Sequence, residues 1–219
     1  MASLLLVVAA GSGSRLGRAE PKALVSLAGR SLLARTLEAF APASFERTVV
    51  TAPPDRVADF SRLIGAQGIV VAGGETRSGS VRLGFEALAA ADGDVVAVHD
   101  AARPFLTAEE IGAVVRAAWE TGAAIAAVPV VDTIKKVASG RILRTVDREG
   151  LFAAATPQAF RADLLRRALA SGRDATDEAA LCEDLGIPVA VVPVSRFSFK
   201  ITTPEDLELA EAILNGRKP

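Results

Sequence analysis

The sequence predicts an α/β fold, a mostly parallel sheet with helices on both of its faces. Short runs of apolar residues, many of them β-branched, alternate with helical patterns along most of the chain. This is the order in which crossover helices join parallel strands. The run LLLVVAA at 4–10 is apolar without interruption, as in a strand that is buried on both faces. Half of the 219 residues are hydrophobic, enough to build a sizeable core.

The first half of the chain supplies four of the expected strands. They are predicted at 4–10, 47–52, 68–74 and 94–100, with helices at 31–40, 55–64 and 79–91. Thr107 then begins a further helix, because Thr107 and Glu110 have the spacing of a capping box. In that motif each side chain bonds the backbone N–H of the other residue.

A hairpin interrupts this alternation in the second half of the chain. After an expected strand at 122–130, the residues on either side of Ser139-Gly140 alternate with a period of two, which is a hairpin signal. We therefore expect residues 130–157 to form a projecting arm, inserted in a single domain that spans 1–219. A two-stranded arm is only marginally stable alone, so we expect it to dock on a second subunit.

Four more elements are expected after the arm, and a last helix closes the chain. Helices are predicted at 161–170 and 176–186, and strands at 188–193 and 197–202. Thr203 precedes Pro204, which suits an N-cap followed by the first residue of a helix.

Charge and cysteine counts argue against several function classes. Lys and Arg total 25 against 26 Asp and Glu, without the basic excess of a nucleic-acid-binding surface. No apolar stretch reaches the roughly 18 residues of a membrane span, so a cytoplasmic protein without membrane contact is expected. One Cys (Cys182) and one His (His99) do not supply the ligands of a His/Cys zinc site.

Residues 9–22, AAGSGSRLGRAEPK, follow the first expected strand and suggest a phosphate-binding loop. Gly11 and Gly13 fit the beginning of the dinucleotide fingerprint G-x-G-x-x-G. However, Leu16 stands where the third glycine is needed, and Pro21 interrupts the helix that should follow. A P-loop requires Gly-Lys-Ser/Thr, a tripeptide that does not occur in the sequence. Both nucleotide-binding patterns are therefore disfavoured.

The same loop offers positive charge beside a glycine-rich turn. Successive backbone N–H groups in such a turn form a concave anion site. Arg15 can donate two parallel hydrogen bonds to phosphate oxygens, and Lys22 supplies a mobile point charge. The alternative is an ordinary loop with solvated cations. The position at the carboxyl end of a first strand, where open α/β sheets bind ligands, favours a site that stabilises triphosphate charge.

The loop resembles the signature loop of nucleotidyltransferases that activate sugar or polyol phosphates, enzymes with a Rossmann-like fold. GGETRSGSV at 73–81 and VHDAARP at 98–104 narrow the resemblance to the 2-C-methyl-D-erythritol 4-phosphate cytidylyltransferases of the non-mevalonate isoprenoid pathway. The match continues through VVDTIKKV (130–137), TVDREGLF (145–152), ATPQAF (155–160), ATDEAAL (175–181) and FKITTPEDLELAE (199–211). These segments keep the family's order and span nearly the whole chain.

The resemblance implies a role for particular residues of this sequence. The CTP triphosphate would be held by Gly11, Gly13, Arg15 and Lys22, and its nucleoside by Ala9, Ala10, Gly74 and Ser80. Asp100 would serve the metal, the ribose or the polyol. The methylerythritol phosphate would be held by Arg103, Thr133, Arg148, Thr156, Thr176 and Lys200. Catalysis would depend on Arg15, Lys22, Arg148 and Lys200.

The family's reaction transfers a cytidylyl group from CTP to the polyol phosphate and releases pyrophosphate, with Mg²⁺ as the expected cofactor. The attacking phosphate is already ionised near neutral pH, because the second pKa of a phosphomonoester is about 6, so no general base is required. The family's arm embraces a partner subunit, which implies a homodimer with Thr133, Arg148 and Thr156 acting across the interface. Val8 and Glu75 depart from the proline and aspartate that the family often has.

Two other functions remain open at this point. A ribitol 5-phosphate cytidylyltransferase would share most of these motifs and differ in its acceptor. A non-catalytic nucleotide-binding regulatory protein would be expected to lose the cationic pair, yet Arg15 and Lys22 are both present. His99 ends an expected strand, and we expect it to have a structural role.

Overall fold

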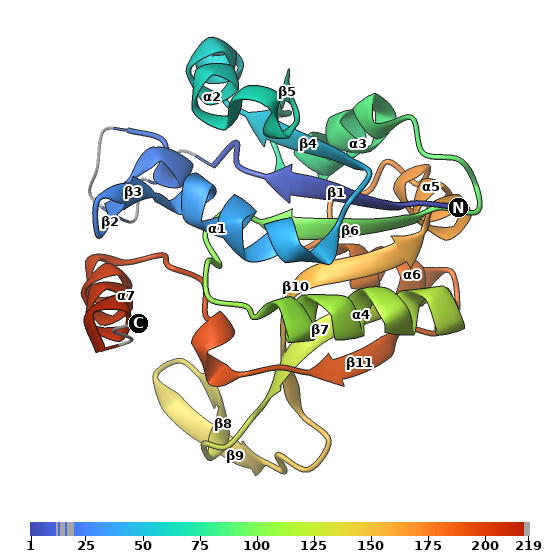
Figure 1. Cartoon of the computed structure of the whole chain (residues 1–219). Helices are drawn as coiled ribbons and strands as arrows, with labels where there is room; N and C mark the ends of the chain where they lie inside the picture. The colour runs from blue at the N-terminus through green and yellow to red at the C-terminus, as the bar shows by residue number, and fades with distance from the viewer. Residues whose placement is uncertain (12, 14–15, 17–19, 217–219) are drawn as a thin grey trace.

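A seven-stranded sheet forms the centre of the molecule (Figure 1). The computed structural model describes residues 1–11, 13, 16 and 20–216. The strand order is β11-β7-β10-β6-β1-β4-β5. The strands are β1 (Ser3–Val8), β4 (Arg47–Ala52), β5 (Ile69–Ala72), β6 (Val95–Asp100), β7 (Ala123–Pro129), β10 (Phe152–Arg161) and β11 (Ala190–Pro193). β10 runs antiparallel to β6 and β7, and the other neighbouring pairs are parallel.

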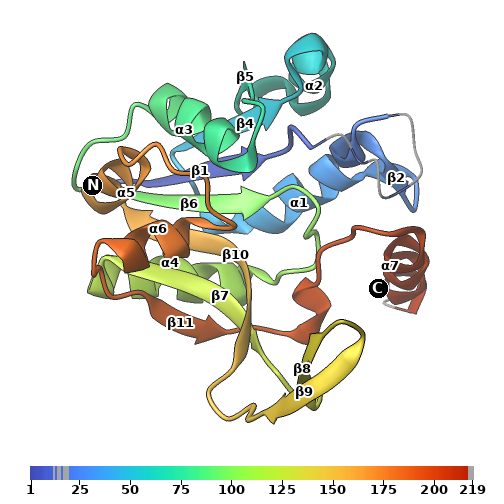
Figure 2. The same ribbon diagram turned by 180° about the vertical axis from the view of Figure 1, so that it is seen from behind.

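Helices cover both faces of this sheet, as the sequence predicts (Figures 1 and 2). They are α1 (Leu32–Phe40), α2 (Val57–Ile64), α3 (Arg77–Leu88), α4 (Ala108–Thr121), α5 (Ala162–Leu169), α6 (Glu178–Asp184) and α7 (Pro204–Gly216). Buried side chains of α1, α2 and α4 share one hydrophobic cluster, and those of α3, α5 and α6 share another. None of the helices in the described residues combines the length and apolar character needed to cross a bilayer.

Side chains of β1 point alternately to the two faces of the sheet, and both faces are apolar, which explains why its sequence is apolar without interruption. Leu5 and Val7 belong to the cluster under α1, α2 and α4, whereas Leu4 and Leu6 belong to the cluster on the opposite face. Successive side chains of a strand point to opposite faces, so both faces of β1 are buried. The absence of polar positions therefore reflects a central place in the sheet.

Most predicted elements occur within a few residues of their expected positions. The strand at 47–52 has the predicted bounds. The capping box of α4 is confirmed, since Thr107 Oγ1 accepts from the Glu110 N–H at 3.2 Å and Glu110 Oε2 accepts from the Thr107 N–H at 2.9 Å. The N-cap at Thr203 is confirmed in the same way, because its Oγ1 accepts from the Asp206 N–H at 3.3 Å.

Two parts of the sheet differ from the sequence prediction. The strand expected at 197–202 is wrong: Arg196–Ser198 forms a 3₁₀ turn. The residues after this turn pack in a third cluster, where buried Ile201 lies with Leu207 and Ala210 of α7. β10 is a strand that the periodicity does not predict, because its residues at 155–160 are buried without alternation and include a proline.

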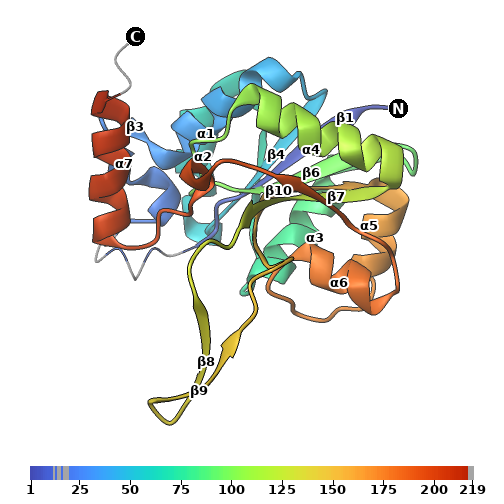
Figure 3. The same ribbon diagram turned by 90° about the horizontal axis from the view of Figure 1, so that it is seen from below.

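The predicted hairpin is present and projects from the body (Figure 3). β8 (Ile134–Ala138) and β9 (Arg141–Val146) form a separate two-stranded sheet, joined by Ser139 and Gly140. Both turn residues have positive φ, 48° and 73°, as a tight hairpin turn requires. The residues at 152–157, which the prediction assigns to the arm, lie in β10 and its pairing with the central sheet. A second small hairpin consists of β2 (Ser26–Leu27) and β3 (Arg30–Ser31).

Candidate active site

A cavity of about 260 Å³ opens at the carboxyl ends of β1 and β6. Ligands of open α/β sheets bind at this edge of the sheet. The wall is formed by the loop after β1, the turn that leads into α3, the end of β6 and the segment before α7. It consists of Val8, Ala9, Ala10, Gly11, Gly13, Lys22, Ala23, Gly74, Glu75, Thr76, Arg77, Ser80, Asp100, Ala101, Ala102, Lys200 and Thr202.

The cavity collects most of the residues that the sequence assigns to CTP. Ala9, Ala10, Gly11, Gly13, Lys22, Gly74, Ser80 and Asp100 all line it, and so does Lys200 from the set assigned to the polyol phosphate. Arg15 lies outside the described residues. Segments from the two ends of the chain and from its middle therefore form one wall. The parallel strands β1, β5 and β6 bring their carboxyl ends to the same edge, and the segment with Lys200 joins them through a bond from the Ile201 N–H to the Ala102 carbonyl at 2.9 Å.

The turn before α3 is held tightly by its own side chains. Ser80 Oγ accepts from the Gly74 N–H at 3.1 Å and donates to the Thr76 carbonyl at 3.0 Å. Thr76 Oγ1 caps the helix by accepting from the Gly79 N–H at 3.0 Å. A Cβ atom on Gly74 would lie 2.9 Å from the Gly79 carbonyl carbon, so the close approach of the two backbones requires glycine. This wall is small, rigid and rich in backbone polar groups.

Cations surround the buried carboxylate of Asp100 at the end of β6. Lys200 Nζ lies 2.9 Å from Asp100 Oδ2, and Arg103 Nε lies 3.7 Å from the same oxygen. Arg77 Nε lies 3.4 Å from Oδ1. Burial alone would raise the pKa of Asp100, but these cations, Lys200 foremost, hold it well below its ordinary value. Asp100 is therefore ionised throughout the physiological pH range.

Lys22 joins the loop after β1 to the segment that carries Lys200. Its Nζ donates to the Ile201 carbonyl at 2.9 Å. Both lysines line the cavity, so two ammonium groups and a glycine-rich backbone face the same space. That arrangement can bind a polyanion and can follow a change in its charge.

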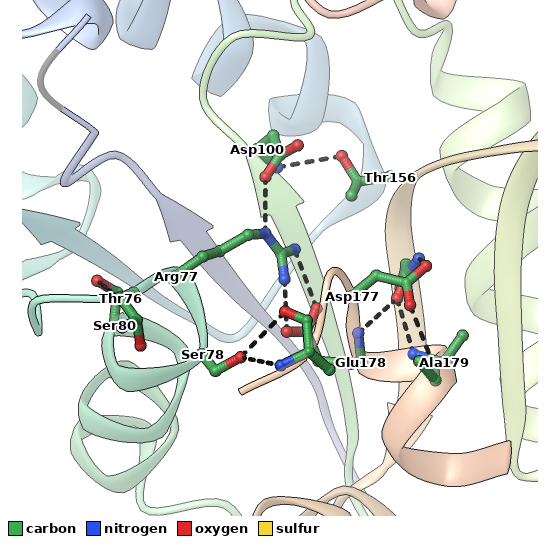
Figure 4. Close-up of polar contacts among 12 residues, drawn as sticks. Thr76, Arg77, Ser78, Ser80, Asp100, Thr156, Asp177, Glu178 and Ala179 are labelled. Carbon is green, nitrogen blue, oxygen red and sulfur yellow. Dashed lines mark hydrogen bonds and ion pairs between the residues drawn. The ribbon is translucent and has the colours of Figure 1, made fainter. Parts of the chain in front are cut away.

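The structure also brings in Arg77 and Glu178, which sequence analysis missed (Figure 4). The Arg77 guanidinium donates to both carboxylate oxygens of Glu178, at 2.6 and 3.0 Å, on the side away from the cavity. The two residues are 101 positions apart. The sequence signal was available, since Arg77 lies in GGETRSGSV and Glu178 in ATDEAAL, but nothing in the sequence pairs them.

A protein-family comparison identifies the chain's relatives. The family described as 2-C-methyl-D-erythritol 4-phosphate cytidylyltransferase (IspD) matches residues 3–216. The chain belongs to this family.

Individual relatives agree with this membership. Proteins named 2-C-methyl-D-erythritol 4-phosphate cytidylyltransferase from Frankia casuarinae and Deinococcus radiodurans are 47% and 48% identical over 215 and 212 residues. Each match covers 95% of this chain, and it covers 80% and 88% of the respective relative. The crystal structure of the Thermus thermophilus enzyme of that name superposes with a TM-score of 0.82 at 36% identity. That superposition covers 98% of this chain and 100% of the other. The predicted family and its nucleotidyltransferase fold are therefore confirmed.

Within this IspD fold, five residues that the resemblance assigns to the polyol phosphate lie away from the cavity wall. They are Arg103, Thr133, Arg148, Thr156 and Thr176. Thr133, Arg148 and Thr176 are exposed, and Arg148 donates to the Val131 carbonyl within its own arm. Arg103 lies beside Asp100 and donates through Nη1 to the Ser198 carbonyl at 2.7 Å. Of the polyol-phosphate set, Lys200 alone lines the cavity, as far as the described residues show.

The hydroxyl of Thr156 is used inside the protein. Its Oγ1 accepts from the Asp100 N–H at 3.1 Å, so its proton is available to His99 Nδ1 at 3.0 Å. His99 Nε2 then carries the ring proton and donates to the Arg103 carbonyl at 3.1 Å. Burial lowers the pKa of His99 to about 3. His99 is thus a neutral ring that supports the turn from Asp100 to Arg103, in agreement with the structural role expected for it.

The donor set of the cavity fits a cation that arrives with a nucleotide. Among the described residues, no three His, Cys, Asp or Glu side chains cluster to form a metal site. Asp100 is an ionised carboxylate that lines the cavity, with Lys200 facing one of its oxygens and Arg77 the other, and Glu75 lines the same wall. Mg²⁺ is commonly bound by one or two carboxylates together with substrate phosphates. These residues fit a nucleotide-borne Mg²⁺ and do not form an all-protein cage.

Proposed function

We propose that the protein transfers the cytidylyl group of CTP to 2-C-methyl-D-erythritol 4-phosphate, giving 4-diphosphocytidyl-2-C-methyl-D-erythritol and pyrophosphate. The observation that carries this proposal is the cavity itself, in which Lys22, Lys200 and Asp100 face a glycine-rich loop in a chain of the cytidylyltransferase family. The reaction makes the protein a nucleotidyltransferase. CTP is supplied in the cytoplasm, which is where we place the reaction.

The CTP part of the cavity is built for a base and a triphosphate. Ala9, Ala10, Gly74 and Ser80 form a narrow wall for the cytosine and ribose, because small residues let backbone groups approach a ligand closely. Gly11 and Gly13 provide backbone N–H groups for the phosphates, and Lys22 provides charge. Arg15 belongs to the same loop in the sequence and is proposed to bind the triphosphate with Lys22.

The chemical step is an in-line substitution at the α-phosphorus of CTP. An oxygen of the acceptor phosphate forms the new P–O bond, the bond to the β-phosphate bridge breaks, and pyrophosphate leaves with its electrons. No proton has to move, because the attacking phosphate is already a dianion above its second pKa of about 6. Catalysis therefore consists of holding two polyanions in line and stabilising their charge. Lys22 and Lys200, which line the cavity, are the residues that we propose for this role.

Mg²⁺ is the cofactor that we propose for this site. Asp100 would hold it together with the phosphates of CTP. When bound, the ion would supply Lewis-acid stabilisation of the negative charge on the phosphates. The chain's own part is to keep Asp100 ionised and oriented, which Lys200, Arg77 and Arg103 do.

We also propose that the protein acts as a homodimer through the arm. The arm and its base expose several large apolar side chains, namely Val131, Val137, Ile142, Leu143, Leu151 and Phe152. Clusters of this kind commonly mark protein interfaces. Arg148 and Thr133 are exposed on the same arm, so a partner's arm could bring these two side chains to the acceptor phosphate. Thr176 and Lys200 would bind that phosphate from the body.

A subunit-mixing experiment tests this arrangement. Arg148→Ala and Lys22→Ala should each be nearly inactive as homodimers. If Arg148 acts across the interface, random co-refolding of the two variants leaves about a quarter of all sites intact. The measured rate should therefore recover to about a quarter of the wild-type value. Mixing Lys22→Ala with Asp100→Asn is the control, because both residues belong to one body and no intact site can form. Equal rates in the two mixtures would show that Arg148 does not act in trans.

The acid limb of the pH–rate profile should come from the substrate. Below about pH 6 the acceptor becomes a monoanion, so kcat/KM should fall by about tenfold per pH unit. His99 has a pKa near 3 in the folded protein, which places its titration well below this limb. His99→Gln should therefore leave the position of the limb unchanged, even if it lowers stability. A limb that moves in this variant would assign the titration to His99.

The acceptor is tested by pyrophosphate release with CTP, Mg²⁺ and a panel of polyol phosphates. Methylerythritol phosphate should give the highest kcat/KM. A higher value with ribitol 5-phosphate would assign the chain to the related ribitol activity. Release with none of the acceptors would favour a regulatory protein that binds nucleotide without catalysis.

A further inference from the structure

A buried ion pair between Arg77 and Glu178 lies next to Asp100, with Arg77 between the two carboxylates (Figure 4). Glu178 is the first residue of α6, and its side chain is only 1% exposed. Arg77 is the first residue of α3, and it lines the cavity. The fork of the guanidinium meets both oxygens of Glu178, a geometry that fixes the plane of the group as well as its position.

Glu178 is itself anchored to the middle of the sheet. The backbone N–H groups of Glu178 and Ala179 both donate to Gln158 Oε1 at 3.1 Å. Gln158 belongs to β10, and its Nε2 donates to Asp177 Oδ2 at 2.9 Å. The first turn of α6 is therefore tied to a strand whose neighbours are β6 and β7. The carboxylate of Glu178 is a fixed support for Arg77.

The turn that begins α3 is tied to the same part of the chain by two further contacts. Ser78 Oγ accepts from the Ala175 N–H at 3.1 Å. Thr76 Oγ1 donates to Asp174 Oδ1 at 2.7 Å. Arg77 thus lies between Thr76 and Ser78, which bind the segment before α6. A shift of Glu178 would move this segment and the start of α3 together.

The Nε atom of the Arg77 guanidinium helps to hold the Asp100 carboxylate. Arg77 Nε faces Asp100 Oδ1 at 3.4 Å, while Lys200 Nζ faces Oδ2 at 2.9 Å. Cations on both oxygens define the rotation of the carboxylate about its own axis. An arginine side chain loses much rotamer freedom when it is ordered. Arg77 can therefore keep Nε beside Asp100 only while its Nη1 and Nη2 atoms are also bound. Glu178 supplies that hold.

We propose that Arg77 and Glu178 are positioning residues for the transfer reaction, in which Glu178 holds the Arg77 guanidinium beside Asp100 and so fixes the carboxylate that faces the cavity. This inference rests on the function proposed above. Glu178 does not line the cavity, so its effect on the reaction passes through Arg77. Burial disfavours the charged form of Arg77, but the carboxylates of Glu178 and Asp100 outweigh this and raise its pKa, so Arg77 stays charged. Burial raises the pKa of Glu178, and the Arg77 guanidinium opposes that rise.

A double-mutant cycle tests the proposal. Glu178→Gln keeps the shape of the side chain and removes its charge, and it should lower kcat about tenfold. Arg77→Met should lower kcat about 30-fold. Because Glu178 acts through Arg77, the double variant should be no slower than Arg77→Met alone. The KM for CTP should change less than about threefold in Glu178→Gln, since binding and turnover separate when a contact acts in the transition state.

The double variant also separates positioning from simple stability. It buries no unpaired charge at this pair, so its melting temperature should lie closer to that of the wild type than either single variant's does. Its turnover should nevertheless remain low. The matched control is Asp92→Asn/Arg166→Met, which neutralises a solvent-exposed ion pair between α5 and the loop before β6 and should leave kcat within about twofold.

Three outcomes would overturn the proposal. The first is a wild-type rate in the double variant, which would make the pair merely structural. The second is a kcat loss in the double variant equal to the product of the single losses, which would mean that Glu178 acts independently of Arg77. The third is an unchanged kcat in Glu178→Gln. Failure of the proposed function is a separate result, because the wild-type protein would then release no pyrophosphate in the same assay.

Discussion

Lys22→Ala is expected to lower kcat by about 10²- to 10³-fold, while the Kd of CTP rises less than tenfold. The ammonium of Lys22 lines the cavity and is held by the Ile201 carbonyl at 2.9 Å. A cation held in this way can stabilise charge that grows on the α-phosphate and on the departing pyrophosphate. This additional charge is absent from bound CTP and develops only as the reaction proceeds, so the loss should affect turnover more than affinity. Steady-state rates and calorimetric CTP titrations provide the two quantities.

A conservative variant separates charge from geometry at the same position. Lys22→Arg keeps the positive charge but replaces a point charge with a planar fork. It should recover part of the lost rate, and its affinity for CTP should stay near that of the wild type. If Lys22→Ala turned over at the wild-type rate, Lys22 would have no role in the transition state.

Asp100→Asn is expected to have the largest effect on stability together with a loss of activity. The side chain of Asp100 is 9% exposed and is surrounded by Arg77, Arg103 and Lys200. Removing one member of a buried charge cluster leaves its partners uncompensated, which typically costs about 3 kcal/mol or more in the free energy of unfolding. Urea unfolding at pH 7 measures this loss directly. The rate should fall about 10²-fold or more, because the carboxylate proposed to hold Mg²⁺ is gone.

The matched control for Asp100→Asn is an exposed aspartate with a similar partner. Asp92 pairs with Arg166, and its side chain is 78% exposed. Ion pairs of this kind contribute little to stability, because solvent screens them. Asp92→Asn should therefore unfold at the same urea concentration as the wild type. If Asp100→Asn were equally stable, the three cations would not need Asp100 as their counter-charge.

Half-saturation by Mg²⁺ gives an independent measure of the role of Asp100. A carboxylate that binds the ion together with CTP should raise the Mg²⁺ concentration needed for half the maximal rate when it is replaced by an amide. The increase should be at least about tenfold in Asp100→Asn. An unchanged Mg²⁺ requirement would leave Asp100 with an electrostatic role only.

Local patterns predicted much of the fold because their causes are local. The apolar run of β1 and the capping residues of α4 and α7 all depend on residues within a few positions of one another. The hairpin turn at Ser139-Gly140 is equally local. Each of these local patterns is enough to predict its element, whatever the rest of the chain packs against it. β10 and the segment at 199–202 could not be predicted from local patterns, because their conformation depends on the distant residues that pack against them.

The sequence by itself determined the family, the loop for which we propose phosphate binding, and many of the residues that line the cavity. These follow from motifs in which the chemistry and the spacing lie in one short stretch. The tertiary structure alone decided that Arg77 meets Glu178 across 101 positions, and that Thr156 uses its hydroxyl to hold His99 and Asp100 rather than to line the cavity. Such contacts depend on which strands become neighbours, and that choice is made by burial over the whole sheet. The residue that a side chain contacts is therefore decided by the packing of the whole fold, whereas the chemical type of each side chain is given by the sequence.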